Sequence, residues 1–306
     1  MLLEVDPDQI GLKSRSYCVS GAARSGTTQI AMLLSTARGA EYVNEPHVVA
    51  HLMQLLVDGR VEVNAAKDLL DTYFFWGELV PSLTGRGINT NRHDQTFAGN
   101  WLGEKELESR LTHSWRYDDI KGRLDQAKLV VKFVDQMHSL TQYASLWTAM
   151  PIIAILRNPV AVASSVRVRG YFREPSTKPN HQPMRYESRG ANIPTFVSED
   201  LLPIWMDGTW EDRLYIPSLA YLRALSQASN LFLIRYDRIS KSDVLPLFSS
   251  LGLDPGPRTE EMLRTFRPER PLVADTVNLP PRTTVFEEAM DLWREWSRRA
   301  DNQEIA

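Results

Sequence analysis

The sequence contains a single cysteine, Cys18, among its 306 residues. One cysteine excludes a disulfide framework within the chain and a zinc site built from several cysteines. Because Cys18 lies in an apolar run, we expect a buried thiol of the core rather than a reactive group. Any functional site must therefore be built from other residue types.

Long hydrophobic runs and an excess of positive charge are also absent. No apolar run reaches the roughly 18 residues that a membrane-spanning helix requires. The N-terminal segment is acidic where a secretory signal has a basic stretch. A formal net charge of −3 provides no basic field for nucleic acid. We expect a cytoplasmic protein that spans no membrane and binds no nucleic acid; the sequence leaves the oligomeric state open.

Four short apolar runs indicate buried strands. Each is rich in Val, Ile, Leu or Phe and ends at polar or turn-forming residues, which is typical of strands covered on both faces. Because helical patterns lie between them, the sequence predicts an α/β fold: a P-loop-like, three-layer domain with a mostly parallel sheet flanked by helices. The runs occupy residues 16–21, 127–134, 150–158 and 230–237.

Two long polar segments interrupt this alternation, at about residues 84–123 and 171–210. Polar stretches of this length without core periodicity are either disordered or form lids and substrate walls. The chain shows no internal repeat. We therefore expect residues 1–306 to form a single domain that carries two insertions.

A glycine-containing turn joins the first predicted strand to the first predicted helix. Its sequence, GAARSGTT at residues 21–28, has the glycine spacing of a phosphate-binding loop. Such a turn directs backbone N–H groups and a helix N-terminus at a bound anion. Hydroxyl groups and a guanidinium group add further donors. The residues expected to form this anion site are Arg24, Ser25, Gly26, Thr27 and Thr28.

The turn lacks the lysine that nucleoside-triphosphate enzymes place after the second glycine. That lysine contacts the β- and γ-phosphates, and the Ser or Thr after it binds Mg²⁺. Thr27 stands in the lysine's position. A γ-phosphate would lose its main protein cation here, which argues against a kinase or NTPase. A glycine-rich turn without any ligand is the structural alternative.

A second strand end meets a second predicted helix at Arg157, in the sequence LRNPVAVASS. Asn158 is a favourable N-cap, and Pro159 suits the first helical position. Ser165 follows Arg157 by about two helical turns. Alone, these residues could simply start a helix. Combined with the first turn in a parallel sheet, they predict two anion sites that flank one nucleotide.

The two motifs together resemble those of sulfotransferases that use 3′-phosphoadenosine 5′-phosphosulfate (PAPS). GAARSGTT is similar to the loop that binds the 5′-phosphosulfate, and LRNPVAVASS to the motif that binds the 3′-phosphate. The resemblance implies that Arg24 lies at the 5′-phosphosulfate and that Arg157 and Ser165 bind the 3′-phosphate. It also implies transfer of a sulfuryl group without a metal.

The same resemblance bears on the base that accepts the acceptor's proton. Phenol- and alcohol-type members carry a histidine two residues after a lysine, but Lys132 is followed by Phe133 and Val134. Carbohydrate-type and some bacterial members place a glutamate after the first helix, and EYVNEPHVV at 41–49 resembles that segment. Its Glu45 precedes a proline, which disfavours helical geometry.

Glu45 is therefore the predicted catalytic base, and His47 and His138 stay open as alternatives. Lys132 interrupts the apolar run LVVKFV, where a lysine without a partner is costly to bury. By resemblance, Lys132 would contact the sulfuryl group and stabilise the leaving oxygen. A strand-end lysine that reaches solvent is the alternative.

A carboxylate base favours a hydroxyl, or an amine, of a small-molecule or glycan acceptor: a carbohydrate, lipid or natural product. The two insertions would form the acceptor's walls. A nucleoside-triphosphate kinase and a non-catalytic nucleotide-binding protein are the alternative functions. Two basic segments, 167–189 and 262–271, have no assigned role. The second lacks the Arg-Lys-Gly pattern that sulfotransferases often have over the 3′-phosphate.

Overall fold

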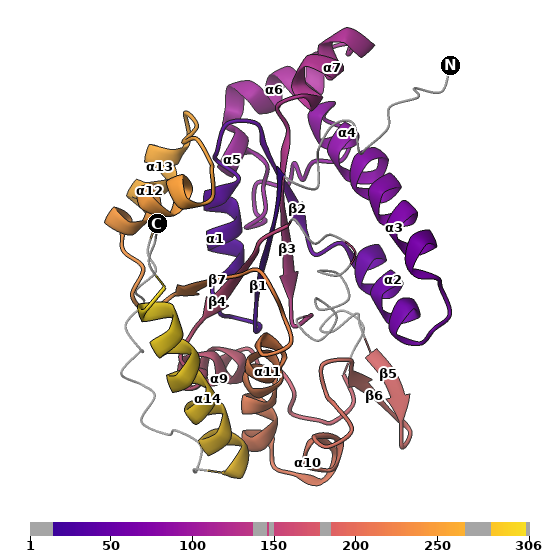
Figure 1. The fold of residues 1–306 in the computed structure, drawn as a ribbon, viewed down its shortest axis with the longest axis vertical. Helices are drawn as coiled ribbons and strands as arrows, with labels where there is room; N and C mark the ends of the chain where they lie inside the picture. Colours follow the sequence, from indigo (N-terminus) through magenta and orange to yellow (C-terminus); the bar gives the residue numbers. More distant parts are fainter. Residues whose placement is uncertain (1–14, 137–145, 147–149, 178–184, 267–282, 304–306) are drawn as a thin grey trace.

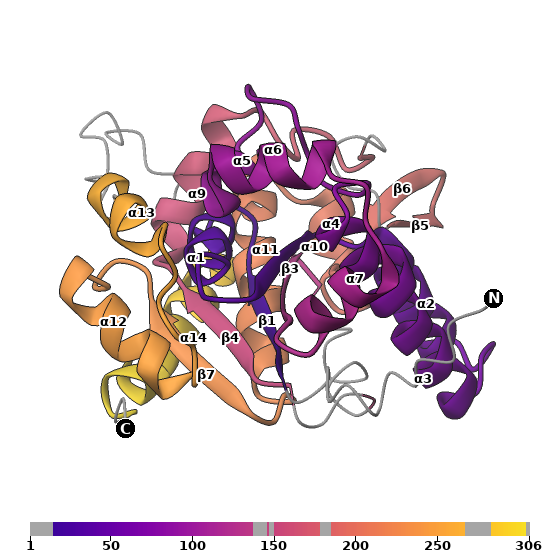
Figure 2. The same ribbon diagram turned by 90° about the horizontal axis from the view of Figure 1, so that it is seen from above.

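Five parallel strands form the central sheet of the computed structural model, which describes residues 15–136, 146, 150–177, 185–266 and 283–303 (Figure 1). The strand order is β2-β3-β1-β4-β7. Helices cover both faces of this sheet (Figure 2). The predicted α/β class, with a parallel sheet flanked by helices, is therefore confirmed. The strands are β1 Ser16–Gly21, β2 Ala40–Asn44, β3 Lys128–Val134, β4 Ile152–Leu156 and β7 Leu231–Arg235.

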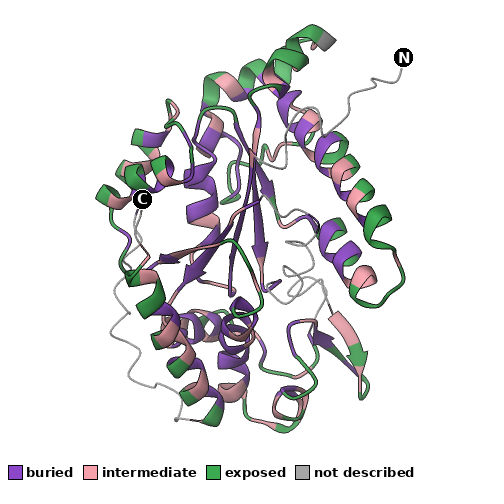
Figure 3. Cartoon of the chain, in the orientation of Figure 1, coloured by how far each residue is buried: buried purple, intermediate pink, exposed green. Residues whose placement is uncertain are grey.

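Strands β1 to β4 are largely buried, whereas the edge strand β7, which was predicted to be buried, is mostly half-buried (Figure 3). The strand side chains enter two separate apolar clusters, one on each face of the sheet. Cys18 packs in a cluster with residues of helices α2 (His47–Val57), α9 (Pro159–Val168), α11 (Trp210–Leu225) and α14 (Thr284–Asp301). Its neighbour Val19 packs in a cluster with residues of helices α1 (Thr27–Leu34), α5 (Gly99–Leu102) and α12 (Lys241–Ser250). Alternation along a strand sends successive side chains to opposite faces. The Cys18 thiol is fully buried, as the sequence predicts.

The helices and a small hairpin complete the described fold. An antiparallel hairpin pairs β5 Arg185–Ser188 with β6 Ala191–Pro194. The helices are α1 Thr27–Leu34, α2 His47–Val57, α3 Val63–Thr72, the π-helix η2 Tyr73–Leu79, α4 Val80–Leu83, α5 Gly99–Leu102, α6 Glu104–Thr112, α7 Tyr117–Leu124, α9 Pro159–Val168, α10 Leu202–Asp207, α11 Trp210–Leu225, α12 Lys241–Ser250, α13 Thr259–Thr265 and α14 Thr284–Asp301.

Two helices begin where the sequence predicts. Helix α1 starts at Thr27, directly after the glycine-containing turn. Helix α9 starts at Pro159, and the side chain of Asn158 accepts a hydrogen bond of 2.9 Å from the backbone N–H of Val160. This side chain satisfies one of the N–H groups that every helix start leaves unpaired. Both helices therefore direct their N-termini at the carboxyl ends of the strands that precede them.

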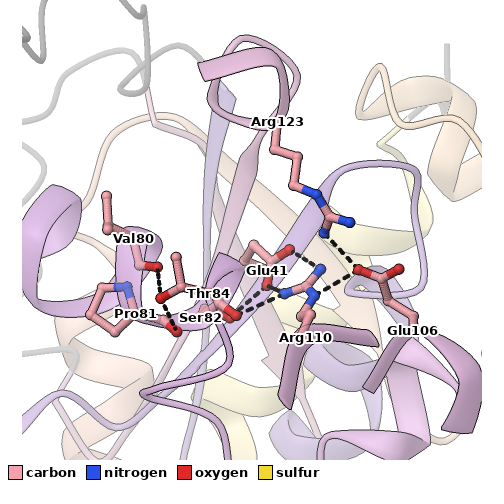
Figure 4. Close-up of polar contacts among 8 residues, drawn as sticks. All are labelled: Glu41, Val80, Pro81, Ser82, Thr84, Glu106, Arg110 and Arg123. Carbon is pink, nitrogen blue, oxygen red and sulfur yellow. Dashed lines mark hydrogen bonds and ion pairs between the residues drawn. The ribbon is translucent and has the colours of Figure 1, made fainter. Parts of the chain in front are cut away.

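Strand β2 is not among the predicted strands. It is short and carries a charged residue, Glu41, whose side chain is almost fully buried. Its carboxylate pairs with both terminal nitrogens of Arg110 at 2.7 Å and accepts a 2.6 Å hydrogen bond from Ser82 (Figure 4). The partners lie 69 and 41 residues away in sequence. No local pattern indicates such pairing.

The first polar segment, 84–123, is held by this ion pair together with a few buried apolar side chains, among them Phe97, Trp101 and Leu107. It contains α5, α6 and most of α7. Arg110 from α6 also pairs with Glu106 at 2.8 Å, and Arg123 reaches the same carboxylate at 2.7 Å (Figure 4). Arg110 donates four hydrogen bonds from a buried position, and through Glu41 it ties the segment to the edge strand β2.

The described part of the second polar segment, 171–210, is organised around another buried arginine. Arg213 from α11 donates hydrogen bonds of 2.8–3.1 Å to backbone carbonyl oxygens of residues that precede the hairpin β5–β6 in the sequence and of residues that follow it. Polar backbone groups of an irregular segment are thereby satisfied away from water. The four carbonyl groups belong to Phe172, Arg173, Trp205 and Gly208.

Candidate functional site

A cavity of about 600 Å³ opens where the strands β1, β3 and β4 end. The chain connections run to opposite sides of β1 at this point, and open α/β sheets bind ligands at such a position. The structure brings all of the sequence-predicted site residues except Ser25, which is buried, into the lining of this cavity. The ones that line the cavity are Arg24, Gly26, Thr27, Thr28, Glu45, Lys132, Arg157 and Ser165.

The turn 21–28 depends on its second glycine, Gly26. Gly26 has φ +99°, and a Cβ at this position would lie 2.1 Å from the ring of Tyr236. The turn is closed by a hydrogen bond of 3.1 Å from the N–H of Ser25 to the carbonyl of Ala22. The hydroxyl of Ser25 is buried and has no hydrogen-bond partner among the described residues.

Arg157 lies on the same side of the sheet as this turn, and the two predicted anion motifs are in direct contact. Arg157 Nη1 donates a hydrogen bond of 2.5 Å to the carbonyl oxygen of Arg24. Arg24 Nε donates to the hydroxyl of Ser165 at 3.3 Å. The side chains of Arg24 and Ser165, which were predicted for opposite ends of one ligand, are therefore in direct contact.

An aromatic ring forms one wall beside these guanidinium groups. The guanidinium of Arg157 lies 5.4 Å from the centre of the Tyr236 ring, within cation–π range. The phenol of Tyr236 donates a hydrogen bond of 2.5 Å to Gln29 on helix α1. The sequence predicted only a strand over residues 230–237, and the structure places Tyr236 in the lining of the cavity.

Lys132 does not reach solvent, which excludes the alternative considered for it. Its side chain is 3% exposed, and Nζ lies 2.7 Å from a carboxylate oxygen of Glu45. Nζ also donates a hydrogen bond of 2.9 Å to the hydroxyl of Thr28. The backbone N–H of Glu45 donates to the carbonyl of Lys132 at 2.9 Å, so both side chains start from adjacent strand ends.

Asp135 is a cavity residue that the sequence analysis missed. It follows β3 directly, and its Oδ1 accepts a hydrogen bond of 2.7 Å from the N–H of Ala23 in the turn. Burial raises the pKa of this carboxyl group to about 7; the nearby charge of Glu45 adds to the rise, and the Ala23 hydrogen bond opposes it. A polar residue directly after an apolar strand is the signal that singled out Arg157, and it also applies here.

The two histidine alternatives differ in what the structure describes. His47 begins α2, is exposed and lines the cavity, so it stays an alternative base. His138 lies outside the described residues. Of the basic segments, 178–184 and 267–271 also lie outside them. In the described remainder, Tyr171 and Met262 line the cavity.

The cavity lining carries more positive than negative groups. Its cations are Arg24, Lys132 and Arg157, and its carboxylates are Glu45 and Asp135.

Within the part of the chain that the structure describes, no group of three or more His, Cys, Asp or Glu residues could hold a metal ion. Among the described helices, none combines the length and apolar character that crossing a bilayer needs.

Solved structures similar to this chain are sulfotransferase domains. The sulfotransferase domain from the Synechococcus PCC 7002 olefin synthase is 13% identical with a TM-score of 0.45, covering 92% of this chain and 94% of that chain. The sulfotransferase STF9 from Mycobacterium avium is 10% identical with a TM-score of 0.38; the match covers 95% of this chain and 77% of that chain. No family model and no curated protein matches the chain. Because these scores and identities are low, function has to be inferred from the cavity itself.

Proposed function

We propose that this chain is a PAPS-dependent sulfotransferase that transfers a sulfuryl group to a hydroxyl or amine of a carbohydrate, lipid or natural-product acceptor. One observation carries the proposal. The turn 21–28, the Arg157–Ser165 motif and the Lys132–Glu45 pair converge in one cavity at the strand ends. Two anion motifs and a cation–carboxylate pair are what a transfer between a nucleotide and a nucleophile requires.

The residues present fit a donor with anionic groups at both ends. The turn offers backbone N–H groups and the N-terminus of α1 to the cavity. Charge-assisted hydrogen bonds contribute about 1.5–3 kcal/mol each, so direct donors outweigh the helix dipole, which adds about 0.3–1 kcal/mol. By the motif resemblance, Arg157 and Ser165 would hold the 3′-phosphate. Arg24, Ser25, Gly26, Thr27 and Thr28 would hold the 5′-phosphosulfate.

When bound, PAPS supplies the sulfuryl group and the 5′-phosphate that leaves with its bonding electron pair. Glu45 takes the proton of the acceptor, a contribution of about 10²–10⁴ in rate for a positioned base. Its carboxylate lines the cavity and is 37% exposed, so an acceptor can approach it. Lys132 Nζ donates to the leaving oxygen from a position that Thr28 and Glu45 hold.

The Thr28 hydroxyl argues against the kinase alternative. In nucleoside-triphosphate loops, the equivalent hydroxyl binds Mg²⁺. Here it accepts a hydrogen bond from the ammonium of Lys132, a positive charge that the chain itself supplies. The turn also lacks the lysine for a γ-phosphate, because Thr27 stands in that position.

Nucleotide preference tests the proposal. We expect adenosine 3′,5′-bisphosphate, the product of sulfuryl transfer, to raise the melting temperature of the full chain more than AMP or ATP with Mg²⁺. A larger stabilisation by ATP with Mg²⁺ would overturn the proposal in favour of a kinase.

Turnover requires a separate assay. The chain should transfer sulfuryl from PAPS to a member of a panel of sugars, lipids and hydroxylated or amine-bearing natural products. Tight bisphosphate binding without transfer to any acceptor, and with no difference between wild type and Glu45→Ala, would favour a non-catalytic nucleotide-binding protein.

A further inference from the structure

Asp135 places a carboxylate against the turn that the proposed function assigns to the donor. Its side chain is 5% exposed, and its Oδ1 holds the N–H of Ala23 at 2.7 Å. Its own N–H donates to the carbonyl of Gly21 at 3.2 Å. Through these two contacts, Asp135 connects the end of β3 to Gly21 and to Ala23 at the start of the turn. A backbone N–H in such a turn is normally available to an anion.

The surroundings of Asp135 are mixed in charge. The other charged or titratable groups that line the cavity are Arg24 of the turn, Glu45 after β2, His47 of α2, Lys132 of β3, Arg157 after β4, and the phenols Tyr171 and Tyr236. Lys132 is already paired with Glu45, and Arg157 bonds the backbone of Arg24. Neither contact neutralises Asp135, whose bonded partner is a neutral amide.

We propose that Asp135 is a positioning residue of the donor site: its carboxyl group fixes the turn 22–26 through Ala23 and takes up a proton when the anionic nucleotide binds. This inference rests on the proposed function, because it needs a nucleotide with phosphate groups in the cavity. The carboxylate acts through the turn and does not contact the reacting atoms.

The physical reason is repulsion between like charges in a buried place. A nucleotide with two phosphate groups brings several negative charges next to a carboxylate that water barely reaches. Burial already raises the pKa of Asp135 to about 7, so only a small further rise makes the neutral acid dominant near neutral pH. The neutral acid still has an oxygen that accepts the Ala23 N–H. Binding and protonation therefore favour each other.

Calorimetry on the full chain tests the linkage with adenosine 3′,5′-bisphosphate as the probe. Titrations in buffers of different ionisation enthalpy, between about pH 6 and about pH 9, give the number of protons taken up on binding. We expect wild type to take up as much as about one proton more than Asp135→Asn near pH 8. Above about pH 7, its Kd should rise relative to that of Asp135→Asn by up to about tenfold per pH unit.

The comparison with Asp135→Asn removes the ligand's own titration and that of His47, because both are the same in the two proteins. Asp254→Asn is the matched control: it removes an exposed carboxylate that does not line the cavity and should behave like wild type. Equal proton uptake by wild type and Asp135→Asn overturns the inference. So does a tightening by Mg²⁺ that occurs in wild type and is lost in Asp135→Asn, since Asp135 would then be a metal ligand.

Amide hydrogen exchange of the nucleotide-free chain tests the positioning role separately. Asp135→Ala should speed exchange in the turn 22–26, whereas Asp135→Asn, which keeps an acceptor oxygen, should not. Unchanged exchange in a folded Asp135→Ala chain overturns that role, and if this variant does not fold, the calorimetry of Asp135→Asn decides. Wild type that binds no bisphosphate would defeat the proposed function and this inference with it; binding without Asp135-dependent proton uptake defeats the inference alone.

Discussion

Lys132 Nζ lies 2.7 Å from a carboxylate oxygen of Glu45, and the two members of this pair differ in burial. The lysine side chain is 3% exposed and the glutamate side chain 37%. A charge that water reaches can lose its partner at small cost, but a buried charge cannot. Loss of the Glu45 carboxylate should therefore destabilise the fold more than loss of the Lys132 ammonium.

This difference predicts an order of stabilities. Glu45→Ala leaves a buried ammonium without its carboxylate and should lower the free energy of unfolding by about 2 kcal/mol, below the 3–5 kcal/mol typical of fully buried pairs. Lys132→Met leaves a carboxylate that solvent reaches and should cost less than about 1 kcal/mol. Urea unfolding measures both values. A larger loss for Lys132→Met would contradict the asymmetry.

Removal of the proposed base should separate catalysis from donor binding. In Glu45→Gln, we expect kcat for sulfuryl transfer to fall by about 10²–10⁴ because a positioned base contributes that much. The affinity for adenosine 3′,5′-bisphosphate should change by less than about threefold, because the new amide keeps an oxygen that can accept a hydrogen bond from Lys132 Nζ and hold it in place. Steady-state kinetics and calorimetry give the two numbers. Glu62→Gln, an exposed carboxylate outside the cavity, is the control; retention of kcat in Glu45→Gln would point to His47 or His138.

Arg157 should discriminate between nucleotides. Arg157→Ala removes the guanidinium assigned to the 3′-phosphate, and one charge-assisted hydrogen bond of about 1.5–3 kcal/mol corresponds to roughly 10- to 150-fold in affinity. The loss should appear for adenosine 3′,5′-bisphosphate and be much smaller for AMP, which lacks the 3′-phosphate. Calorimetry with both ligands measures it, with Arg238→Ala, an exposed arginine paired with Asp301, as the control. Equal losses for both nucleotides would defeat the assignment.

The network around Arg110 predicts a stability difference between two arginines that share Glu106 (Figure 4). Arg110→Ala leaves Glu41 charged and 2% exposed, which should cost about 3–5 kcal/mol of unfolding free energy. Arg123 is 32% exposed, and Arg123→Ala should cost less than about 1 kcal/mol. Urea unfolding compares the variants. Similar losses would show that the buried pair does not hold the segment 84–123 to β2.

The raised pKa of Asp135 predicts how stability depends on pH. The folded chain holds this proton to about pH 7, whereas an unfolded aspartate releases it near pH 4. The group's contribution is therefore fully present below about pH 4 and is lost as pH rises through about 7. As pH rises from about 4 to about 7, the melting temperature of Asp135→Asn should increase relative to that of wild type. A difference that stays constant with pH would contradict the burial effect.

Local sequence patterns predicted the features that depend on neighbouring residues. The buried strands, the turn 21–28 and the start of helix α9 at Pro159 all follow from apolar runs, glycine spacing and an N-cap within a few residues. The hairpin strands β5 and β6 were not predicted, and neither was β2, the one strand of the central sheet that was missed, whose charged residue Glu41 finds its partner 69 residues away.

Apolar runs, glycine spacing and N-cap residues were enough to predict the α/β class and the residue types at the strand ends, because each of these patterns lies within a few consecutive residues. The pairing of side chains across the chain could be read only from the folded protein. Lys132 bonds Thr28 across 104 residues, and Asp135 bonds Ala23 across 112. These contacts form because β1 and β3 lie side by side in the sheet and end at the same edge. Strand order is set by packing of the whole chain, so local sequence patterns do not predict it.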